Sequence, residues 1–264
     1  MTTPSAPDEY SAVAEFYDAV PHYAARPDVA FYVETALTSG GPVLELGCGT
    51  GRVLLPIARA GIEIVGVDGS PAMLNVLRMR LDTEPQAVHE RVTVGDGDMR
   101  RFHLGQQFAL ALIPFRPFQR LLTVEDQLAC LSTIHRHLRD DGRLVFDIFN
   151  PSPGMLNAHI GEELADGPEF TMPDGRRVVR KMRLLAHDRF AQVIERELVY
   201  NVTTPDGSAD RFVHRFWHRN TFRFEMEHLL ARAGFEVEHV YADFERNPYG
   251  SKHPGELIFV AVRR

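Results

Sequence analysis

Residues 43–53 constrain the fold of this chain more than any other segment, and their sequence is VLELGCGTGRV. The pattern predicts a short apolar strand, a turn with three glycines and the beginning of a helix, as in the first crossover of an open α/β sheet. Glycine takes positive φ angles and, lacking a Cβ, lets a ligand approach the backbone. Ligands bind such sheets at the carboxyl ends of the strands, so the turn predicts a ligand site.

The glycine spacing distinguishes between classes of ligand. A dinucleotide fingerprint requires G-x-G-x-x-G, but its last glycine is replaced by Arg52 or Leu54, depending on where the count begins. No Gly-Lys-Ser/Thr follows, so the segment is not a phosphate-binding P-loop. Glu45 lies two residues before the first glycine, and a carboxylate there favours a cationic ligand over a pyrophosphate.

Strand and helix patterns alternate up to residue 150, which predicts βαβ units and a parallel sheet. Ser70 is expected to cap a helix that has Pro71 at its first position. The expected strands are 43–46, 62–67, 91–95, 108–113 and 143–149, and the expected helices are 52–60, 70–81 and 124–138.

The pattern changes after residue 150 to long strands with a period of two, which predicts antiparallel pairing. Turns are expected at two Pro-Asp-Gly sequences, 173–175 and 205–207, and at a bend over 186–189. Residues 151–220 contain ten acidic and ten basic residues, so this insert is not a nucleic-acid clamp. Helical spacing returns at 221–233, and strands are expected at 235–244 and 257–262.

The glycine turn with Glu45 resembles motif I of the class I S-adenosylmethionine-dependent methyltransferases. Across nearly the whole chain, the order of parts resembles bacterial small-molecule N-methyltransferases of the glycine/sarcosine, amino-deoxysugar and lincosamide types. The resemblance implies an α/β fold with a Rossmann-like, seven-stranded, mostly parallel sheet, an antiparallel β insert that acts as a cap, and a helical N-terminal lid. The expected units are the lid (1–40), the α/β core (41–150 and 221–264) and the insert (151–220), which lies over the active site or at a subunit interface.

Asp68 ends the second strand about twenty residues after the glycine turn, where a carboxylate can bind the two ribose hydroxyls. Alternatively, Asp68 caps the next helix. The resemblance places Asp98 and Met99 at the adenine, with Asp96 as a competing acid. The backbone around Ile113 is expected to meet the methionine amino group. The other expected cofactor contacts are Tyr17, Tyr23, Arg26, Glu45, Gly47, Cys48, Gly49 and Met73.

Residues 9–38 combine helical spacing with four of the seven tyrosines. Tyr17, Tyr23 and Arg26 resemble the set with which small-molecule N-methyltransferases close over the cofactor, the arginine pairing with the cofactor carboxylate. The alternative is that Arg26 faces solvent. Tyr10 and Tyr17 can also direct their hydroxyls at the methyl acceptor.

The loop after the fourth strand lacks two motifs of related enzymes. It has no Asn/Asp-Pro-Pro sequence, as in nucleobase methyltransferases, and no acids for a divalent ion. Phe115 and Phe118 are expected to form an apolar wall for the substrate, or else to pack in the core. Gln119 stands where deoxysugar enzymes have a histidine, and it is expected to help orient the acceptor.

The insert offers Trp217 as a substrate contact, with Arg215 and His218 as further candidates, although a surface-sheet role is the alternative for each. His214 and His218 are too far apart on a strand to share one ion, at roughly 13 Å. His135 and His137 point in different directions on a helix. No metal site is therefore expected.

Composition limits the compartment and the partners. The chain has no apolar run of the roughly 20 residues that span a bilayer, no signal-peptide pattern and only two cysteines, so a cytoplasmic protein without a membrane partner is expected. A net charge of −7 argues against a nucleic-acid partner. Whether the chain forms a homo-oligomer is left open.

The expected activity is transfer of a methyl group from S-adenosylmethionine to a small-molecule acceptor, releasing S-adenosylhomocysteine. An amine nitrogen is the favoured acceptor, and the transfer is expected to be an in-line displacement that depends on alignment. Tyr17, Tyr10 and Gln119 are the catalytic candidates. The alternatives are O-methylation of a phenol or hydroxyl, and a non-catalytic protein that binds S-adenosylmethionine.

Overall fold

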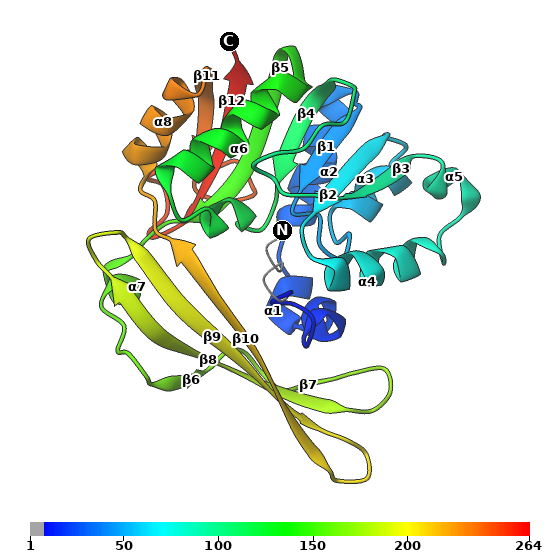
Figure 1. The fold of residues 1–264 in the computed structure, drawn as a ribbon, viewed down its shortest axis with the longest axis vertical. Helices are drawn as coiled ribbons and strands as arrows, with labels where there is room; N and C mark the ends of the chain where they lie inside the picture. Colours follow the sequence, from blue (N-terminus) through cyan, green and yellow to red (C-terminus); the bar gives the residue numbers. More distant parts are fainter. Residues whose placement is uncertain (1–7) are drawn as a thin grey trace, which may run out of the picture.

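A seven-stranded sheet with the order β11-β12-β5-β4-β1-β2-β3 forms the centre of the computed structural model, which describes residues 8–264 (Figure 1). Strands β1 to β5 run parallel, and β12 is antiparallel to both β5 and β11. The predicted mostly parallel sheet with an antiparallel edge is confirmed. The strands are β1 (Val43–Leu46), β2 (Ile64–Asp68), β3 (Val92–Asp96), β4 (Phe108–Ile113), β5 (Leu138–Phe149), β11 (Phe235–Tyr241) and β12 (Glu256–Arg263).

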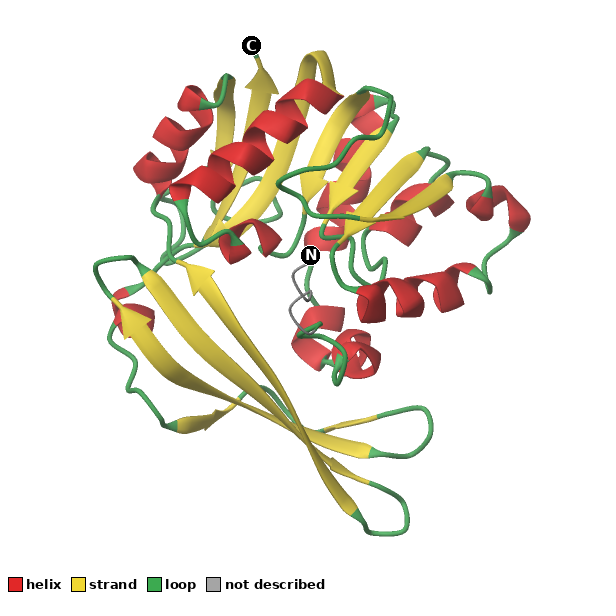
Figure 2. Cartoon of the chain, in the orientation of Figure 1, coloured by secondary structure: helices red, strands yellow, loops and turns green. Residues whose placement is uncertain are grey.

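Helices cover both faces of this sheet (Figure 2). One apolar cluster joins α2 (Asp28–Ser39), α3 (Leu54–Arg59) and α4 (Pro71–Leu81) to the sheet. A second cluster joins α6 (Val124–His137) and α8 (Arg223–Arg232) to it. The short helices α5 (Gln86–His89) and η2 (Pro117–Arg120) lie in connections. The predicted cap of α4 is confirmed, because Ser70 Oγ accepts a hydrogen bond from the Met73 amide at 3.2 Å.

The N-terminal 40 residues divide into two parts. Helix α2 belongs to the core, since Phe31 and Tyr32 are buried in the cluster with α3. The preceding helices η1 (Ala14–Ala19) and α1 (Pro21–Ala24) lie instead between the central sheet and the insert (Figure 1). Residues 8–27, which include both helices, are called the N-terminal segment. Residues 1–7 of the expected lid lie outside the described residues.

The insert is an antiparallel sheet that leaves the core after β5 and returns before α8 (Figure 1). Phe16 and Val20 of the N-terminal segment pack on its inner face against Tyr200 and Val178. This third cluster connects the N-terminal segment to the insert. The insert comprises α7 (Pro153–Leu156), β6 (Glu163–Ala165), β7 (Phe170–Thr171), β8 (Arg177–Asp188), β9 (Val193–Thr203) and β10 (Ala209–Arg219).

Two predicted boundaries are wrong. The turn between β8 and β9 lies at residues 189–192 and not at 186–189, because the Asp188 carboxylate accepts hydrogen bonds from the Phe190 and Ala191 amides and so stabilises the later turn. Strand β5 begins at Leu138 and not at residue 143, because Leu138 already pairs with Phe108 of β4. The other predicted elements of the core are present with small shifts at their ends.

Candidate active site

A cavity of about 1400 Å³ lies between the carboxyl ends of the sheet strands, the N-terminal segment and the insert. Its wall includes the glycine turn after β1, the ends of β2 and β3, the loop after β4 and the inner face of β8, β9 and β10. Most of the expected site residues therefore border one space. Three of them, Ile113, Phe118 and Trp217, are not part of its wall.

The turn after β1 requires glycine for two reasons. Gly47 and Gly49 have φ angles of +68° and +53°, which side chains rarely adopt. A Cβ on Gly47 would also lie 2.7 Å from Cγ of Pro117. Met73 and Met99 border the same turn, with their terminal methyl groups 3.2 Å from a Cβ at Gly49 and 3.9 Å from one at Gly47. The two glycines also border the cavity, so their backbone can contact a ligand there.

Glu45 is only 2% exposed, and its Oε2 atom has no hydrogen-bond partner. Burial raises the pKa of Glu45 well above its ordinary value, while the nearby Arg52 opposes this shift. A buried carboxyl group with a free oxygen at the cavity wall is suited to a positively charged ligand. This feature fits the cationic methionine part of S-adenosylmethionine.

Asp68 is not the cap of α4, which is Ser70, but it binds two backbone amides beside that cap. Its Oδ2 accepts a hydrogen bond from the Gly49 amide and its Oδ1 accepts one from the Ser70 amide, both at 2.8 Å. Each carboxylate oxygen retains a second lone pair, so Asp68 can stabilise the chain before α4 and still receive two hydroxyl groups. Asp8 lies beside it and accepts from the Ser70 hydroxyl and the Ala72 amide.

Asp96 and Asp98 both reach the cavity wall at the end of β3, so the structure does not separate them as candidates for the adenine contact. They differ in their partners. Asp98 forms an ion pair with Arg100 at 2.6 Å, and this guanidinium holds the pKa of Asp98 below its usual range. Asp98 is therefore fixed as an anionic acceptor.

Arg26 does not face solvent, because its side chain is 8% exposed and pairs with Asp147 at 2.8 Å. The solvent-facing alternative is wrong. Its Nε atom also lies 3.5 Å from Asp28, while its buried Nη1 atom has no partner. One donor of the guanidinium is therefore left for a ligand carboxylate.

Two buried acids that organise this side of the cavity were missed by the sequence analysis. Asp147 accepts hydrogen bonds from the Tyr32 hydroxyl and the Phe115 amide, each at 2.7 Å, in addition to Arg26. Burial opposes its charge, but Arg26, Arg116 and these hydrogen bonds together hold the pKa of Asp147 below its ordinary value. Asp28 binds Arg52 through two hydrogen bonds of 2.7 Å. For Asp147, the sequence signal that could have revealed it was an acid within the apolar strand sequence LVFDIF.

Aromatic rings connect the cofactor side of the cavity to the insert. The ring of Tyr17 lies 5.0 Å from that of Tyr23 and 6.3 Å from that of Tyr10. Tyr10 in turn lies 4.4 Å from the ring of His214 on β10. Burial raises the pKa of both Tyr10 and Tyr17, so their hydroxyl groups remain protonated donors.

The loop after β4 separates its two phenylalanines. Phe115 lies on the cavity wall, 4.7 Å from the ring of Tyr23. Phe118 is completely buried against Phe146, so the core alternative holds and Phe118 is not a substrate contact. Ile113 is likewise fully buried at the end of β4, and the wall begins at the next residue, Pro114.

Gln119 borders the cavity, but its amide is already engaged. Its Nε2 donates to the Arg219 carbonyl at 2.9 Å and its Oε1 accepts from the Phe149 amide at 2.8 Å. The expectation that Gln119 orients the acceptor is therefore replaced by a structural role. Cys48 is 3% exposed, and its side chain packs with the apolar cluster around α3.

Strand β10 turns alternate residues to opposite sides. His214, Phe216 and His218 border the cavity, whereas Trp217 and Arg215 lie on the other face, so Trp217 is not a substrate contact. His218 is 2% exposed and neither of its ring nitrogens has a partner. Burial, reinforced by nearby arginines, lowers the pKa of both histidines to about 3, so both are neutral. In residues 8–264, no three His, Cys, Asp or Glu side chains are grouped to hold a metal ion.

Residues 43–142 match the family described as a methyltransferase domain. The cypemycin N-terminal methyltransferase of a Streptomyces species is 29% identical over the full length of both chains. The dTDP-3-amino-3,4,6-trideoxy-alpha-D-glucopyranose N,N-dimethyltransferase of Streptomyces venezuelae is 27% identical over 83% of this chain and 85% of that protein. By contrast, the ubiquinone biosynthesis O-methyltransferase of Alkalilimnicola ehrlichii, at 30% identity, matches 47% of this chain and 48% of that protein.

Solved structures agree over the whole chain. The CcbJ methyltransferase from Streptomyces caelestis superimposes with a TM-score of 0.76 at 25% identity, covering 97% of this chain and 98% of that one. The SAM-bound amino pentose methyltransferase CalS10 from Micromonospora echinaspora gives a TM-score of 0.68 at 25% identity over the full length of both. Within the described residues, no helix has both the length and the apolar character needed to cross a membrane. Residues 43–142 therefore form a methyltransferase domain, and the matches along the whole chain are to S-adenosylmethionine-dependent methyltransferases.

Proposed function

We propose that this methyltransferase methylates an amine nitrogen of a small molecule that binds between the N-terminal segment and the insert. The observation that carries the proposal is that the cavity continues from the glycine turn to the inner face of the insert. The wall there combines the hydroxyl groups of Tyr10 and Tyr17 with the neutral imidazole of His214. Such a wall can hold an acceptor beside the cofactor and exclude water.

In this proposal, the cofactor occupies the end of the cavity at the sheet. Glu45 faces its cationic methionine part, Arg26 its carboxylate, Asp68 its ribose, and Asp98 with Met99 its adenine. When bound, S-adenosylmethionine supplies a methyl group on a positively charged sulfur. The ion pairs with Asp28 and Asp147 hold Arg26 in place, and the Gly49 amide of the glycine turn holds Asp68.

The neutral side chains at the other end favour an amine over a hydroxyl acceptor. An unprotonated amine already carries a lone pair, whereas a phenol or alcohol needs a base that removes its proton. A histidine with a pKa of about 3 and protonated tyrosines are poor bases. His214 Nε2, which has no partner, is available to accept a hydrogen bond from the amine. Two relatives matched over most or all of their length, one named as an N-terminal methyltransferase and one as an N,N-dimethyltransferase, also support this choice.

The assignment of the cofactor site is tested by calorimetry with S-adenosylhomocysteine. Wild type should bind it, and Asp68→Ala should bind at least tenfold more weakly because the ribose loses its carboxylate. Undiminished binding by Asp68→Ala would contradict the assignment. Asp206→Ala is a matched control, because Asp206 lies in the exposed turn between β9 and β10.

The acceptor half is tested with cofactor carrying a labelled methyl group and a metabolite extract. Label should appear in an N-methyl product. Label only in methyl ethers or esters would show that the acceptor is oxygen.

A further inference from the structure

Arg196 differs from every other arginine on the cavity wall. Of the eight arginines there, seven form an ion pair with a carboxylate. No carboxylate of the described residues pairs with Arg196, whose Nη1 donates a hydrogen bond to the Met182 sulfur at 3.5 Å. A thioether is a weak acceptor, so the donors of this guanidinium are largely unsatisfied.

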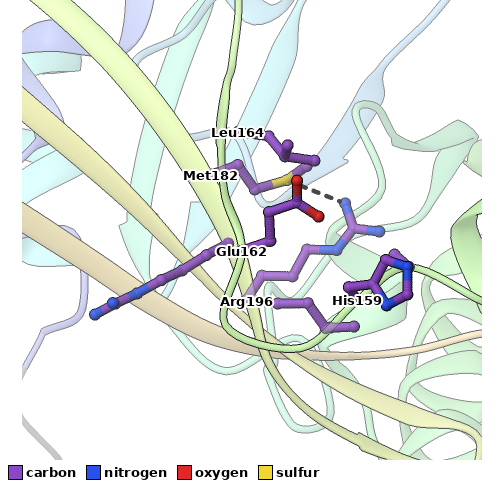
Figure 3. A pocket seen from close by; sticks show the side chains of 8 residues that line it. His159, Glu162, Leu164, Met182 and Arg196 are labelled. Atoms are coloured by element: carbon purple, nitrogen blue, oxygen red, sulfur yellow. Dashed lines mark hydrogen bonds between the residues drawn. The ribbon is translucent and has the colours of Figure 1, made fainter.

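Arg196 is half-buried and borders both the main cavity and a smaller pocket. Its guanidinium carbon lies 5.6 Å from the centre of the Phe149 ring. Its side chain also borders a small pocket of about 40 Å³ whose wall includes Leu164 (Figure 3). Glu162 also borders this pocket but is exposed and forms no ion pair with Arg196. Burial, only partly countered by Asp166, lowers the pKa of Arg196.

His218 adds a second unsatisfied group at the same place. Its ring centre lies 6.0 Å from that of Phe149, the ring that Arg196 also faces. His218 is 98% buried (2% exposed), and both of its ring nitrogens lack partners. A neutral imidazole can donate one hydrogen bond, so an oxyanion here would meet a charged donor and a neutral donor.

We propose that Arg196 and His218 form a subsite for an oxyanion of the methyl acceptor, a carboxylate or a phosphate group. The inference rests on the proposed function, because it names the class of amine that the enzyme methylates. The half-buried guanidinium of Arg196 has no ion-pair partner among the described residues, so a ligand oxyanion would supply the missing countercharge on binding. The planar guanidinium matches either anion through two parallel hydrogen bonds.

The subsite is tested on the complex with S-adenosylhomocysteine, using sodium phosphate and sodium acetate as probes at constant ionic strength with chloride. Calorimetry or NMR titration should show binding of at least one probe. Arg196→Gln should weaken that binding at least tenfold, and Arg196→Lys should restore part of it. Arg189→Gln makes the same charge change in the exposed turn between β8 and β9 and should bind as wild type does.

The probes distinguish the two anions, since selective binding of phosphate indicates a phosphorylated acceptor and selective binding of acetate indicates a carboxylate. Binding of neither probe, or equal binding by Arg196→Gln, overturns the proposal. Unchanged affinity for S-adenosylhomocysteine in both Arg196 variants serves as the check on folding. The labelled-methyl screen separates the two proposals. Neutral amines methylated equally well by wild type and Arg196→Gln would refute the subsite alone. Label absent from every amine would refute the proposed function alone.

Discussion

Replacement of Gln119 by leucine is expected to loosen the junction between the central sheet and the insert. The side chain is 1% exposed, and its two hydrogen bonds reach the last residues of β5 and β10, Phe149 and Arg219. The chain enters the insert after the first of these residues and leaves it after the second. One buried amide therefore holds both ends of the insert against the loop after β4.

The magnitude follows from the groups that lose partners. Leucine has a similar volume, so the apolar packing around position 119 is largely kept. Two hydrogen bonds of about 1 kcal/mol each are lost, and the Phe149 amide and Arg219 carbonyl left without the side chain add about 1–2 kcal/mol. The expected decrease in the free energy of unfolding of Gln119→Leu is about 3–4 kcal/mol. Gln119→Glu should retain the bond from the Phe149 amide but place an oxygen against the Arg219 carbonyl, so it should also destabilise.

Urea denaturation followed by circular dichroism measures this decrease. Gln127→Leu is the matched control, because Gln127 is also buried but its amide nitrogen has no partner. That variant should be neutral or slightly stabilised. If Gln119 acted on the acceptor instead, Gln119→Leu would lose methyl transfer while its unfolding free energy stayed within about 0.5 kcal/mol of wild type. That pair of results would refute the structural role.

Three further predictions concern charge. Binding of S-adenosylhomocysteine should release a proton, because burial raises the pKa of Glu45 and the ligand's ammonium group favours the carboxylate. Calorimetry in buffers of different ionisation enthalpy should show this release in wild type. Release of a proton by Glu45→Gln as well would show that Glu45 is not its source. The free energy of unfolding should fall as the pH decreases from about 6.5 towards 3, because His214 and His218 have folded pKa values of about 3 and take up protons only on unfolding. Each histidine contributes about 1.4 kcal/mol per pH unit. Denaturant titrations of His218→Asn should show a dependence of this free energy on pH that is smaller by one proton, and an equal dependence would refute this. Arg196→Met should raise the unfolding free energy of the ligand-free protein by about 1 kcal/mol in urea, because it removes a half-buried cation without an ion pair. A decrease would mean that Arg196 is stabilised by its present contacts.

Features that depend on neighbouring residues along the chain were predictable from the sequence. Glycines at positive φ, the Ser70 cap and the strand–helix alternation are local properties, and they identified the sheet and its ligand-binding edge. The positions of Glu45 and Asp68 followed as well, because each lies at a fixed distance from the glycine turn. The boundary of β5 was less predictable, since it depends on pairing with β4.

Features that depend on contacts between distant segments were not predictable. A period of two in β10 separates two faces, and both carry aromatic and basic residues, so it does not tell which face meets the cavity. Trp217 was therefore assigned to the wrong side, while His214 was considered only as a metal ligand. Asp147 was missed for a related reason, because its partners Arg26 and Tyr32 lie more than 100 residues away in the sequence.

The distribution of charge in the cavity explains how one enzyme can orient an acceptor without a dedicated base. The glycine-turn end carries Glu45, Asp68 and Asp98, whereas the insert end carries the unpaired cation of Arg196. In an acceptor with an amine at one end and an oxyanion at the other, the oxyanion would be attracted to Arg196 and repelled by the carboxylates at the glycine turn, which favours the orientation that brings the neutral amine towards the cofactor side. Alignment of reacting atoms at about 3–3.5 Å contributes several kcal/mol to such a reaction. The insert would then contribute to catalysis by binding the end of the acceptor that does not react. An acceptor with a shorter distance between its amine and its oxyanion should therefore show a decrease in kcat that is larger than the increase in KM.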